Sequence, residues 1–275
     1  MADWHDWIGK AQEQADTLTP ALLARFRATI DSEDTGDIAP QGIHWCLCLP
    51  DAATAELGED GHPRKGGWLP PIPLPRRMWA SSKLVFHGAI CAGDAVTRRS
   101  TVANITEKSG GSGWLVFVDI DHETFADGRP VVSERQTLVY REASTAAPTP
   151  RPADDVQDLL EWQWHRRVTP SEALLFRYSA LTFNSHRIHY DAPYALGAEH
   201  YRGLVVHGPL TATLLLNLAG QRLGVNRLKQ FSFRGQSPAF AGEPLDLVGT
   251  VNGDVIKLAA LGGDGRIIMS AEASL

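Results

Sequence analysis

The stretch Gly203–Gly224 reads GLVVHGPLTATLLLNLAGQRLG and is the clearest buried-helix pattern in the chain. Pro209 suits the first turn of a helix, where its missing N–H costs nothing, and Gly224 suits the C-terminal cap. Leucines recur at helical spacing, at Leu210, Leu214, Leu215 and Leu218. We therefore predict an apolar helix that needs protein on every side.

Three strand-like segments follow this helix, at residues 245–252, 254–261 and 266–273. The run Gly262-Gly263-Asp264-Gly265 is a turn signal between the last two of them. A curved antiparallel sheet can cover a single buried helix, and this is the hot-dog architecture. The second half of the chain thus predicts an α+β fold of this type.

The first half repeats the pattern. Thr19-Pro20 and Thr169-Pro170 each predict a helix start with a threonine cap, and Glu172 completes a capping box with Thr169. Phe86-His87-Gly88 corresponds to Phe233-Arg234-Gly235. Strands are expected at residues 95–106, 114–122 and 131–141, and a weaker central helix around 45–57, interrupted by a proline. We predict a duplicated unit, hence a double hot dog; two unrelated α+β domains are the alternative.

A proline-rich segment divides the chain near its middle. Residues 144–155 read STAAPTPRPADD, a composition typical of a linker. We predict an N-terminal hot-dog unit at residues 1–143 and a C-terminal unit at residues 156–275.

The bulk composition excludes several classes of protein. Among 275 residues, 43% are hydrophobic and the formal net charge is −6, so no basic surface indicates nucleic-acid binding. The three cysteines form no CxxC pair, which favours a reducing compartment. No signal-like or membrane-spanning apolar run is present. The sequence predicts a cytoplasmic protein without nucleic-acid or membrane partners.

The segment Phe183–Asp191, FNSHRIHYD, carries the densest set of polar side chains. His189 is the candidate proton carrier, because imidazole titrates near neutral pH. Asn184 could hold a water molecule but cannot accept a proton. The plain alternatives are a loop histidine bonded to a backbone carbonyl for His189 and a helix-capping amide for Asn184. Asp191 is a candidate for orienting His189.

Gly208 stands at the start of the leucine-rich helix, directly after His207. The first N–H groups of a helix have no partner within the helix, and the helix dipole favours negative charge there. A glycine also lets a substrate oxygen approach closely. Gly208 is therefore a candidate oxyanion-binding residue, and a simple turn before Pro209 is the alternative.

A possible metal site and the matching positions of the first half bear on which residues form the site. His186, His189 and His207 could ligate a metal, but no carboxylate is placed convincingly beside them, so we expect no metal and no other cofactor. In the first half, the positions that match Asn184 and His189 are Ser32 and Asp37. We therefore expect the N-terminal unit to be non-catalytic and to help form the substrate tunnel.

These residues resemble the MaoC-like, or hydratase-2, family, whose motif is Gly-Asp-x-Asn-Pro-x-His followed by a His-Gly pair. Asn184 stands where the family has Asp, His186 where it has Asn, and Arg187 where it has Pro. His189 and the pair His207-Gly208 agree strictly. Together with Arg76–Ala80, RRMWA, the run resembles the double hot-dog branch of mitochondrial-type 3-hydroxyacyl-thioester dehydratases and mesaconyl-C4-CoA hydratases.

The resemblance implies a hydro-lyase that reversibly hydrates a 2-enoyl-CoA thioester. The expected substrate is 3-methylfumaryl-CoA (mesaconyl-C4-CoA), which would give a citramalyl- or methylmalyl-type CoA. The alternatives are a 3-hydroxyacyl-thioester dehydratase of fatty-acid type, a thioesterase and a non-catalytic acyl-thioester-binding hot dog.

The implied roles are specific. His189, Asn184 and Gly208 would act in catalysis. His186, Arg187, Tyr190, His207 and Arg202 would contact the substrate. Arg187 and Arg202 are the candidates for binding a distal carboxylate. The partner is an acyl-CoA or acyl-carrier thioester, and a homo-oligomer is compatible with the sequence.

Overall fold

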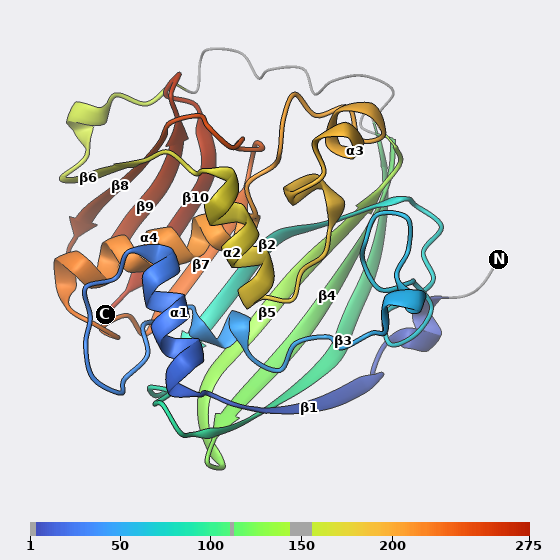
Figure 1. Ribbon diagram of the computed structural model, residues 1–275, viewed down its shortest axis with the longest axis horizontal. Coiled ribbons are helices and arrows are strands. Elements are labelled where there is room, and N and C mark those ends of the chain that lie inside the picture. The colour runs from blue at the N-terminus through green and yellow to red at the C-terminus, as the bar shows by residue number, and fades with distance from the viewer. Residues whose placement is uncertain (1–3, 111–112, 144–155) are drawn as a thin grey trace.

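The computed structural model describes residues 4–110, 113–143 and 156–275, so the predicted linker at 144–155 lies outside the described residues. Ten antiparallel strands form one sheet, in the order β1-β3-β4-β5-β2-β7-β10-β9-β8-β6 (Figure 1). The strands of the first half are β1 (Ala11–Thr17), β2 (Arg76–Phe86), β3 (Ala95–Gly110), β4 (Gly113–Ala126) and β5 (Arg129–Arg141). Those of the second half are β6 (Trp164–Val168), β7 (Gln230–Gly235), β8 (Leu245–Asn252), β9 (Val255–Gly262) and β10 (Ile267–Ser274).

The α-helices are α1 (Pro20–Ile30), α2 (Glu172–Leu181), α3 (Ala192–Gly197) and α4 (Gly208–Leu223). Short 3-10 helices cover Trp4–Trp7, Ile43–Cys46, Thr54–Glu56, Leu159–Glu161 and Arg187–His189. No helix in the described ranges is long and apolar enough to cross a membrane.

The two halves of the sheet meet at β2 and β7. Ser81 to Val85 pair with Arg234 to Gln230, so the pairing is confined to the second part of β2. The register of β2 against β5 shifts between Trp79 and Ser81. Bulges of this kind bend a strand and often lie next to active sites. The first residues of β2, from Arg76 to Ala80, therefore leave β7 and border the space between the halves.

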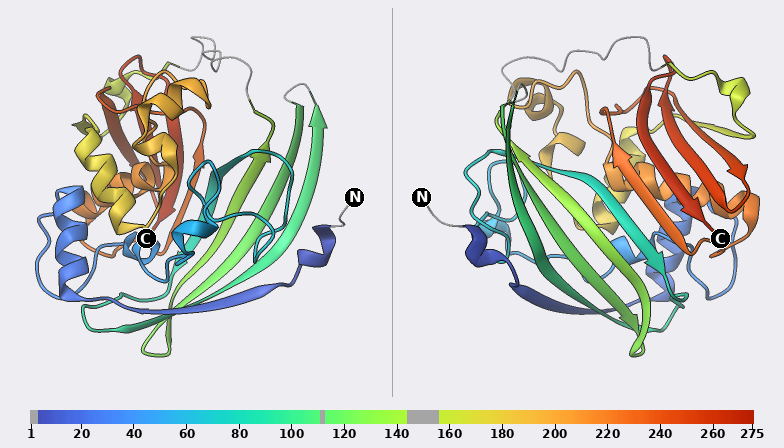
Figure 2. Two further views of the ribbon diagram at one scale, coloured as in Figure 1. Left: turned by 45° about the vertical axis from the view of Figure 1, so that its right-hand side comes forward. Right: turned by 180° about the vertical axis from the view of Figure 1, so that it is seen from behind.

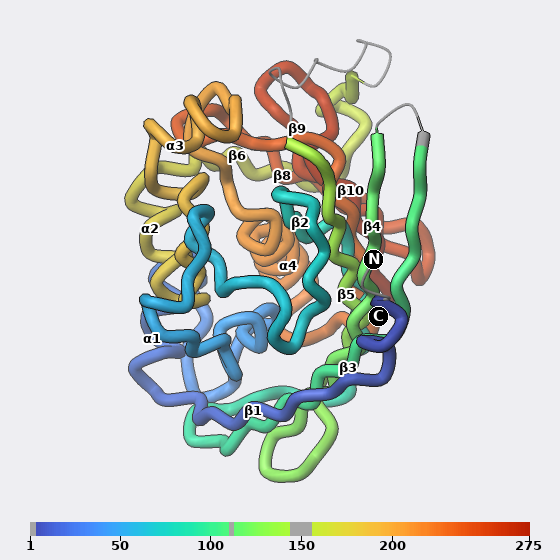
Figure 3. The backbone as a smooth tube through the Cα atoms, turned by 90° about the vertical axis from the view of Figure 1, so that its right-hand side faces the viewer, coloured from blue at the N-terminus to red at the C-terminus, as the bar shows by residue number. Residues whose placement is uncertain are grey.

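Helix α4 occupies the centre of the fold. Figure 3 views it nearly along its axis, with the strands on one side and α1 and α2 on the other. Every residue from Leu210 to Ala219 is buried. The sheet curves around this helix (Figure 2), and burial of each leucine stabilises the fold by roughly 1.5–3 kcal/mol.

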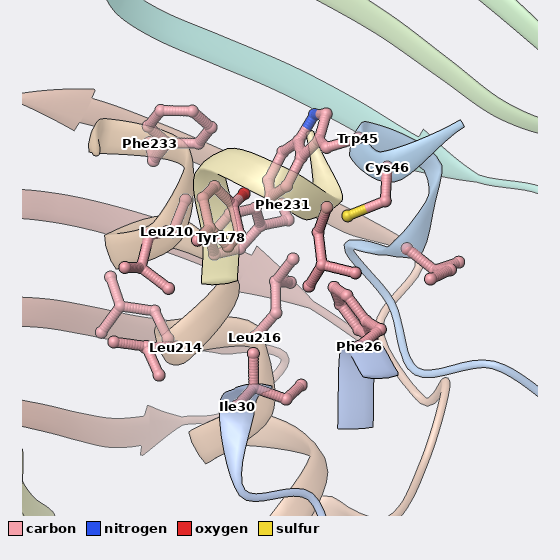
Figure 4. Packing of buried hydrophobic residues seen from close by; sticks show 14 of the residues in the cluster. Phe26, Ile30, Trp45, Cys46, Tyr178, Leu210, Leu214, Leu216, Phe231 and Phe233 are labelled. Carbon is pink, nitrogen blue, oxygen red and sulfur yellow. The ribbon is translucent and has the colours of Figure 1, made fainter. Parts of the chain in front are cut away.

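The core around α4 draws on both halves of the chain. Phe26 and Ile30 of α1, Tyr178 of α2 and Phe231 of β7 belong to one buried cluster with the α4 leucines (Figure 4). The predicted α+β double hot-dog fold is thus confirmed in its helices and strands.

Two local predictions differ from the structure. The expected central helix of the first half is replaced by the two short 3-10 helices Ile43–Cys46 and Thr54–Glu56, since Pro50 between them cannot donate a helical hydrogen bond. Helix α2 is capped by Ser171, whose hydroxyl accepts from the Leu174 N–H, and not by Thr169. The predicted cap at Thr19 is confirmed, because its side chain accepts from Leu22 N.

Candidate active site

The segment Phe183–Asp191, which follows α2, begins with a tight reversal of the chain. Phe183 adopts a left-handed conformation with φ 47°, and the Asn184 N–H donates to the Ser179 carbonyl (2.9 Å). The Asn184 side-chain oxygen accepts from the His186 N–H at 3.0 Å. Asn184 therefore shapes the loop that leads into the 3-10 helix Arg187–His189, whereas the cap that ends α2 is Thr182.

His189 is buried and its tautomer is set by the backbone. Its Nδ1 lies 2.7 Å from the carbonyl oxygen of Val205, which can only accept, so Nδ1 carries the proton and Nε2 is left as a base. Burial lowers the pKa of His189 from 6.5 to about 4, although the Val205 carbonyl acts in the opposite direction. His189 is thus neutral at pH 7 and able to accept a proton.

His207 stacks on His189, with ring centroids 3.6 Å apart. Its Nε2 lies 2.8 Å from the Ser179 hydroxyl, whereas its Nδ1 is buried without a partner in the described structure. Burial holds the pKa of His207 well below 6.5. The next residue, Gly208, is the first of α4, and the described residues supply no hydrogen-bond acceptor for its N–H. A base and a free helix-start donor therefore stand close together.

The first half of the chain adds two residues that the sequence did not identify. The His62 ring lies 4.2 Å from the His186 ring, and His186 lies 5.4 Å from His189. The His62 Nδ1 is 3.2 Å from the Asp60 carboxylate. Burial lowers the pKa of both His62 and His186, with the positive charge of Arg77 acting in the same direction.

The loop that carries Asp60 and His62 is attached to the motif through its backbone. The Arg187 N–H donates to the Asp60 carbonyl at 2.9 Å, and the Ser185 hydroxyl donates to the Gly61 carbonyl at 2.5 Å. Gly61 has φ +84°, and a Cβ there would lie 2.0 Å from the Ser185 carbonyl oxygen. Only glycine permits this close approach.

Other predicted site residues are bound elsewhere. Arg187 pairs with Asp191 at 2.7 Å and donates to the Glu59 carbonyl. Asp191 caps α3 and does not orient His189, a role taken by Val205. Arg202 makes a two-pronged ion pair with Glu243. Tyr190 is exposed.

A small pocket opens beside this cluster. It is lined by Asp60, Pro75, Arg76, Arg77, Met78, His186, Ile188, Glu199 and Tyr201. Arg76 is buried and neutralised by Glu199, whose carboxylate lies 2.6 Å from the Arg76 Nε. The pocket thus joins the first residues of β2 to the histidine cluster.

Asp60, His62 and His186 also offer three donor atoms within 4.8 Å of one another. Among the described residues, these three side chains are close enough together to hold a metal ion. The His62 Nδ1, however, is within hydrogen-bond distance of the Asp60 carboxylate. The metal alternative weighed from the sequence combined His186 with His189 and His207, whereas the structure places the His186 ring beside Asp60 and His62. A polar Gly-rich segment, Gly58–His62, was the only sequence signal for the loop, and nothing in it indicates its distant partner.

Comparisons with known proteins identify the family of this chain. The family model for hydroxyacyl-thioester dehydratase type 2 matches residues 42–241. The chain is 41% identical to the mesaconyl-C(4)-CoA hydratase of Chloroflexus aurantiacus, over 100% of this chain and 98% of the relative. It is 45% identical to the mitochondrial hydroxyacyl-thioester dehydratase type 2 of Schizosaccharomyces pombe over 80 residues, which cover 28% of this chain and 26% of that protein.

Solved structures show the same fold. HtdX of Mycobacterium tuberculosis superposes with a TM-score of 0.69 at 16% identity, covering 96% of this chain and 98% of that one. A MaoC-like dehydratase of Phytophthora capsici gives 0.71 at 15% identity, with 98% of both chains covered. A further M. tuberculosis protein described as a double hot dog gives 0.59 at 15% identity, with 99% and 98% covered. These structures show the fold, and the family model together with the 41% identical relative shows that the chain belongs to the hydroxyacyl-thioester dehydratase type 2 family.

Proposed function

We propose that this protein reversibly hydrates a 2-enoyl-CoA thioester, with mesaconyl-C4-CoA as substrate and a citramalyl-type CoA as product. The observation that carries the proposal is His189, whose Nε2 is freed by the Nδ1 contact to Val205 and which lies beside the N-terminus of α4. The 41% identity to a mesaconyl-C(4)-CoA hydratase over the whole chain supports this choice of substrate.

The mechanism needs one base and one oxyanion donor. His189 Nε2 removes a proton from water, and the resulting hydroxide attacks Cβ of the enoyl group. Negative charge moves to the thioester oxygen, where the Gly208 N–H donates to it. The proton held by His189 then passes to Cα, so that water is added across the double bond and His189 is neutral again.

The remaining predicted residues support this centre. His207 packs flat against His189 and limits rotation of its ring. Asn184 and Arg187 fix the loop that carries His189. Asn184 acts mainly on backbone geometry in this scheme, because its side-chain oxygen is bonded to the His186 N–H.

An aromatic cluster favours a short acyl group over a fatty chain. Trp45, Trp79 and Phe233 pack together with ring centroids 5.7–6.0 Å apart, where the halves meet. The Trp79 carbonyl lies 3.9 Å from where a Cβ of Gly208 would stand. The backbone of Trp79 is therefore next to the proposed oxyanion donor and its ring belongs to a bulky aromatic cluster, which favours a short acyl group.

The test is turnover of mesaconyl-C4-CoA, crotonyl-CoA and 2-octenoyl-CoA, followed by loss of enoyl-thioester absorbance and by product mass. We expect the first to be hydrated fastest and no free CoA to be released. His189→Ala should lower kcat by about 100-fold or more, because general base catalysis typically contributes 10²–10⁴. The exposed His87→Gln variant is the control, and its kcat should equal that of the parent protein.

Each result has a distinct meaning. Preference for 2-octenoyl-CoA would replace the proposal with fatty 3-hydroxyacyl-thioester dehydration, and release of CoA would indicate a thioesterase. Full turnover by a folded His189→Ala protein would refute the assignment of the base.

A further inference from the structure

We propose that Arg77, Lys65 and Tyr140 form the subsite that binds a carboxylate attached to Cβ of the acyl group. This inference deepens the proposed function and depends on it. It differs from the sequence expectation, which placed the carboxylate on Arg187 or Arg202. Both of those guanidinium groups are already paired with carboxylates of the protein, Asp191 and Glu243.

Arg77 is a cation without a carboxylate partner. It lines the pocket beside His186, and within the described ranges it forms no ion pair. Its neighbour Arg76 is neutralised by Glu199. The positive charge of Arg77 acts on the side chains around the pocket, because it contributes to lowering the pKa of His62 and of His186. An anion bound there would be attracted by a charge that no side chain neutralises.

Lys65 brings a second positive charge close to Arg77, next to the pocket. Its Nζ donates to the carbonyls of Leu74 and Pro75, just before β2, and lies 5.7 Å from the centroid of the Tyr140 ring. Burial lowers the pKa of Lys65, and Arg77 lowers it further, against the opposite effect of Asp60. Two neighbouring cations in a partly buried place repel each other, and an anion between them removes that cost.

Tyr140 supplies a buried hydroxyl. It stands directly opposite Arg77 in the pairing of β2 with β5. The side chain is fully buried, and its hydroxyl faces the Arg77 guanidinium, which can only donate, so that no acceptor for the hydroxyl proton is present among the described residues. Burial raises the pKa of Tyr140, while Arg77 lowers it. A buried donor without an acceptor is costly, and a carboxylate oxygen would satisfy it.

The chemistry of the substrate places a carboxylate at this point. In mesaconyl-C4-CoA the carboxylate is bonded to Cβ, the carbon that water attacks. Its negative charge opposes the approach of hydroxide, so a cation that neutralises it lowers the barrier as well as holding the substrate. The subsite must therefore lie close to His189, and the pocket lined by Arg77 contains His186, whose ring centroid is 5.4 Å from that of His189.

The experiment compares two substrates across matched variants. Arg77→Met and Tyr140→Phe should each lower kcat/KM for mesaconyl-C4-CoA, by roughly 10- to 100-fold for Arg77→Met and roughly 3- to 10-fold for Tyr140→Phe. Turnover of crotonyl-CoA, which lacks the carboxylate, should change by less than about 3-fold. Arg77→Lys should restore part of the loss, because the charge remains and the two-pronged geometry does not.

The control is Arg135→Gln, an exposed arginine on β5 paired with Asp121, which should leave both substrates unaffected. Circular dichroism and thermal unfolding establish that each variant is folded. If Arg77→Met does not fold, Arg77→Lys and Tyr140→Phe still decide, because each keeps nearly the same volume. Equal losses on both substrates, or no loss on either, would refute the subsite while leaving the proposed function intact.

The phosphates of CoA are a second source of negative charge. Repeating the assay with the N-acetylcysteamine thioester of the same acyl group removes them. The proposal expects the Arg77→Met loss to persist on this thioester. A loss that occurs only with the CoA ester would assign Arg77 to the phosphates and overturn the carboxylate subsite. Failure of the parent protein to hydrate any enoyl thioester would instead overturn the proposed function.

Discussion

At the scale of single residues, the properties of His189 follow from one contact and from burial. The Val205 carbonyl fixes the proton on Nδ1, and the surrounding protein disfavours the charged ring. The sequence places His189 in a polar motif, but not the carbonyl that selects its tautomer. That carbonyl is 16 residues further along the chain, and only the fold brings it to the ring.

This environment predicts an unusual pH dependence of catalysis. The base form of His189 is active, and its pKa is lowered to about 4, so kcat/KM should stay level from pH 8 to pH 6 and fall only at lower pH. A pH series of initial rates checks this, with circular dichroism at each pH to exclude unfolding. An apparent pKa near 6.5 for the activity would show that His189 is not the buried base described above.

At the scale of structural elements, the decisive feature is the loop Gly58–His62, which packs on the segment Phe183–Asp191 of the second half. Its backbone hydrogen bonds to Ser185 and Arg187 connect segments more than 120 residues apart. The repeat in the sequence predicted helices and strands in both halves, although not the 3-10 segments of the first half, and it gave no sign that a first-half loop reaches the second-half site. The 3-10 segments that replace the first central helix leave the chain free to form this loop.

Gly61→Ala tests the importance of that contact. The new methyl group would meet the Ser185 carbonyl at 2.0 Å, and φ +84° disfavours any residue with a side chain, so the loop must move away. We expect kcat/KM to fall by about 10-fold or more, because the loop that carries His189 loses its support. The rate assay is accompanied by thermal unfolding to separate activity from stability.

Gly9→Ala is the control for Gly61→Ala. Gly9 has a similar φ of +86° but nothing within 4 Å of the added Cβ, so it reports the backbone strain alone. If both variants lose the same activity, close packing of the loop on the motif is not what the site requires.

At the scale of the whole molecule, five described histidines with lowered pKa values affect stability: His186, His189 and His207 are buried, and His62 and His122 are half-buried. The unfolded chain binds protons below about pH 6.5, whereas the folded protein does not until each lower pKa is reached. The stability contributed by their neutral forms is complete above pH 6.5 and is lost as the pH falls from there. For His189 the window runs down to about pH 4 and corresponds to about 3 kcal/mol, at about 1.4 kcal/mol per pKa unit.

We therefore expect the free energy of unfolding to fall between pH 7 and pH 5, measured by urea denaturation at constant ionic strength. Asp60 and Glu134 have lowered carboxyl pKa values and add a further loss at still lower pH. Between pH 7 and pH 5, the free energy of unfolding of the His189→Gln variant should depend less on pH than that of the parent protein. The exposed His87→Gln variant should show the same pH dependence as the parent protein. A parent protein equally stable at pH 5 and pH 7 would contradict the burial of these histidines as neutral rings.

The sequence by itself determined α4 and most strands of this protein, but not the 3-10 segments of the first half. The leucine spacing of α4, the alternating strands, the turn glycines and the His-x-x-His and His-Gly motifs are local patterns, and each is set by a short stretch of chain. Tertiary structure decided which side chains share the site. Asp60, His62 and Arg77 reach it through strand pairing and loop packing across the two halves, and the Val205 carbonyl reaches it by folding within the second half. These contacts leave no mark in the local sequence pattern.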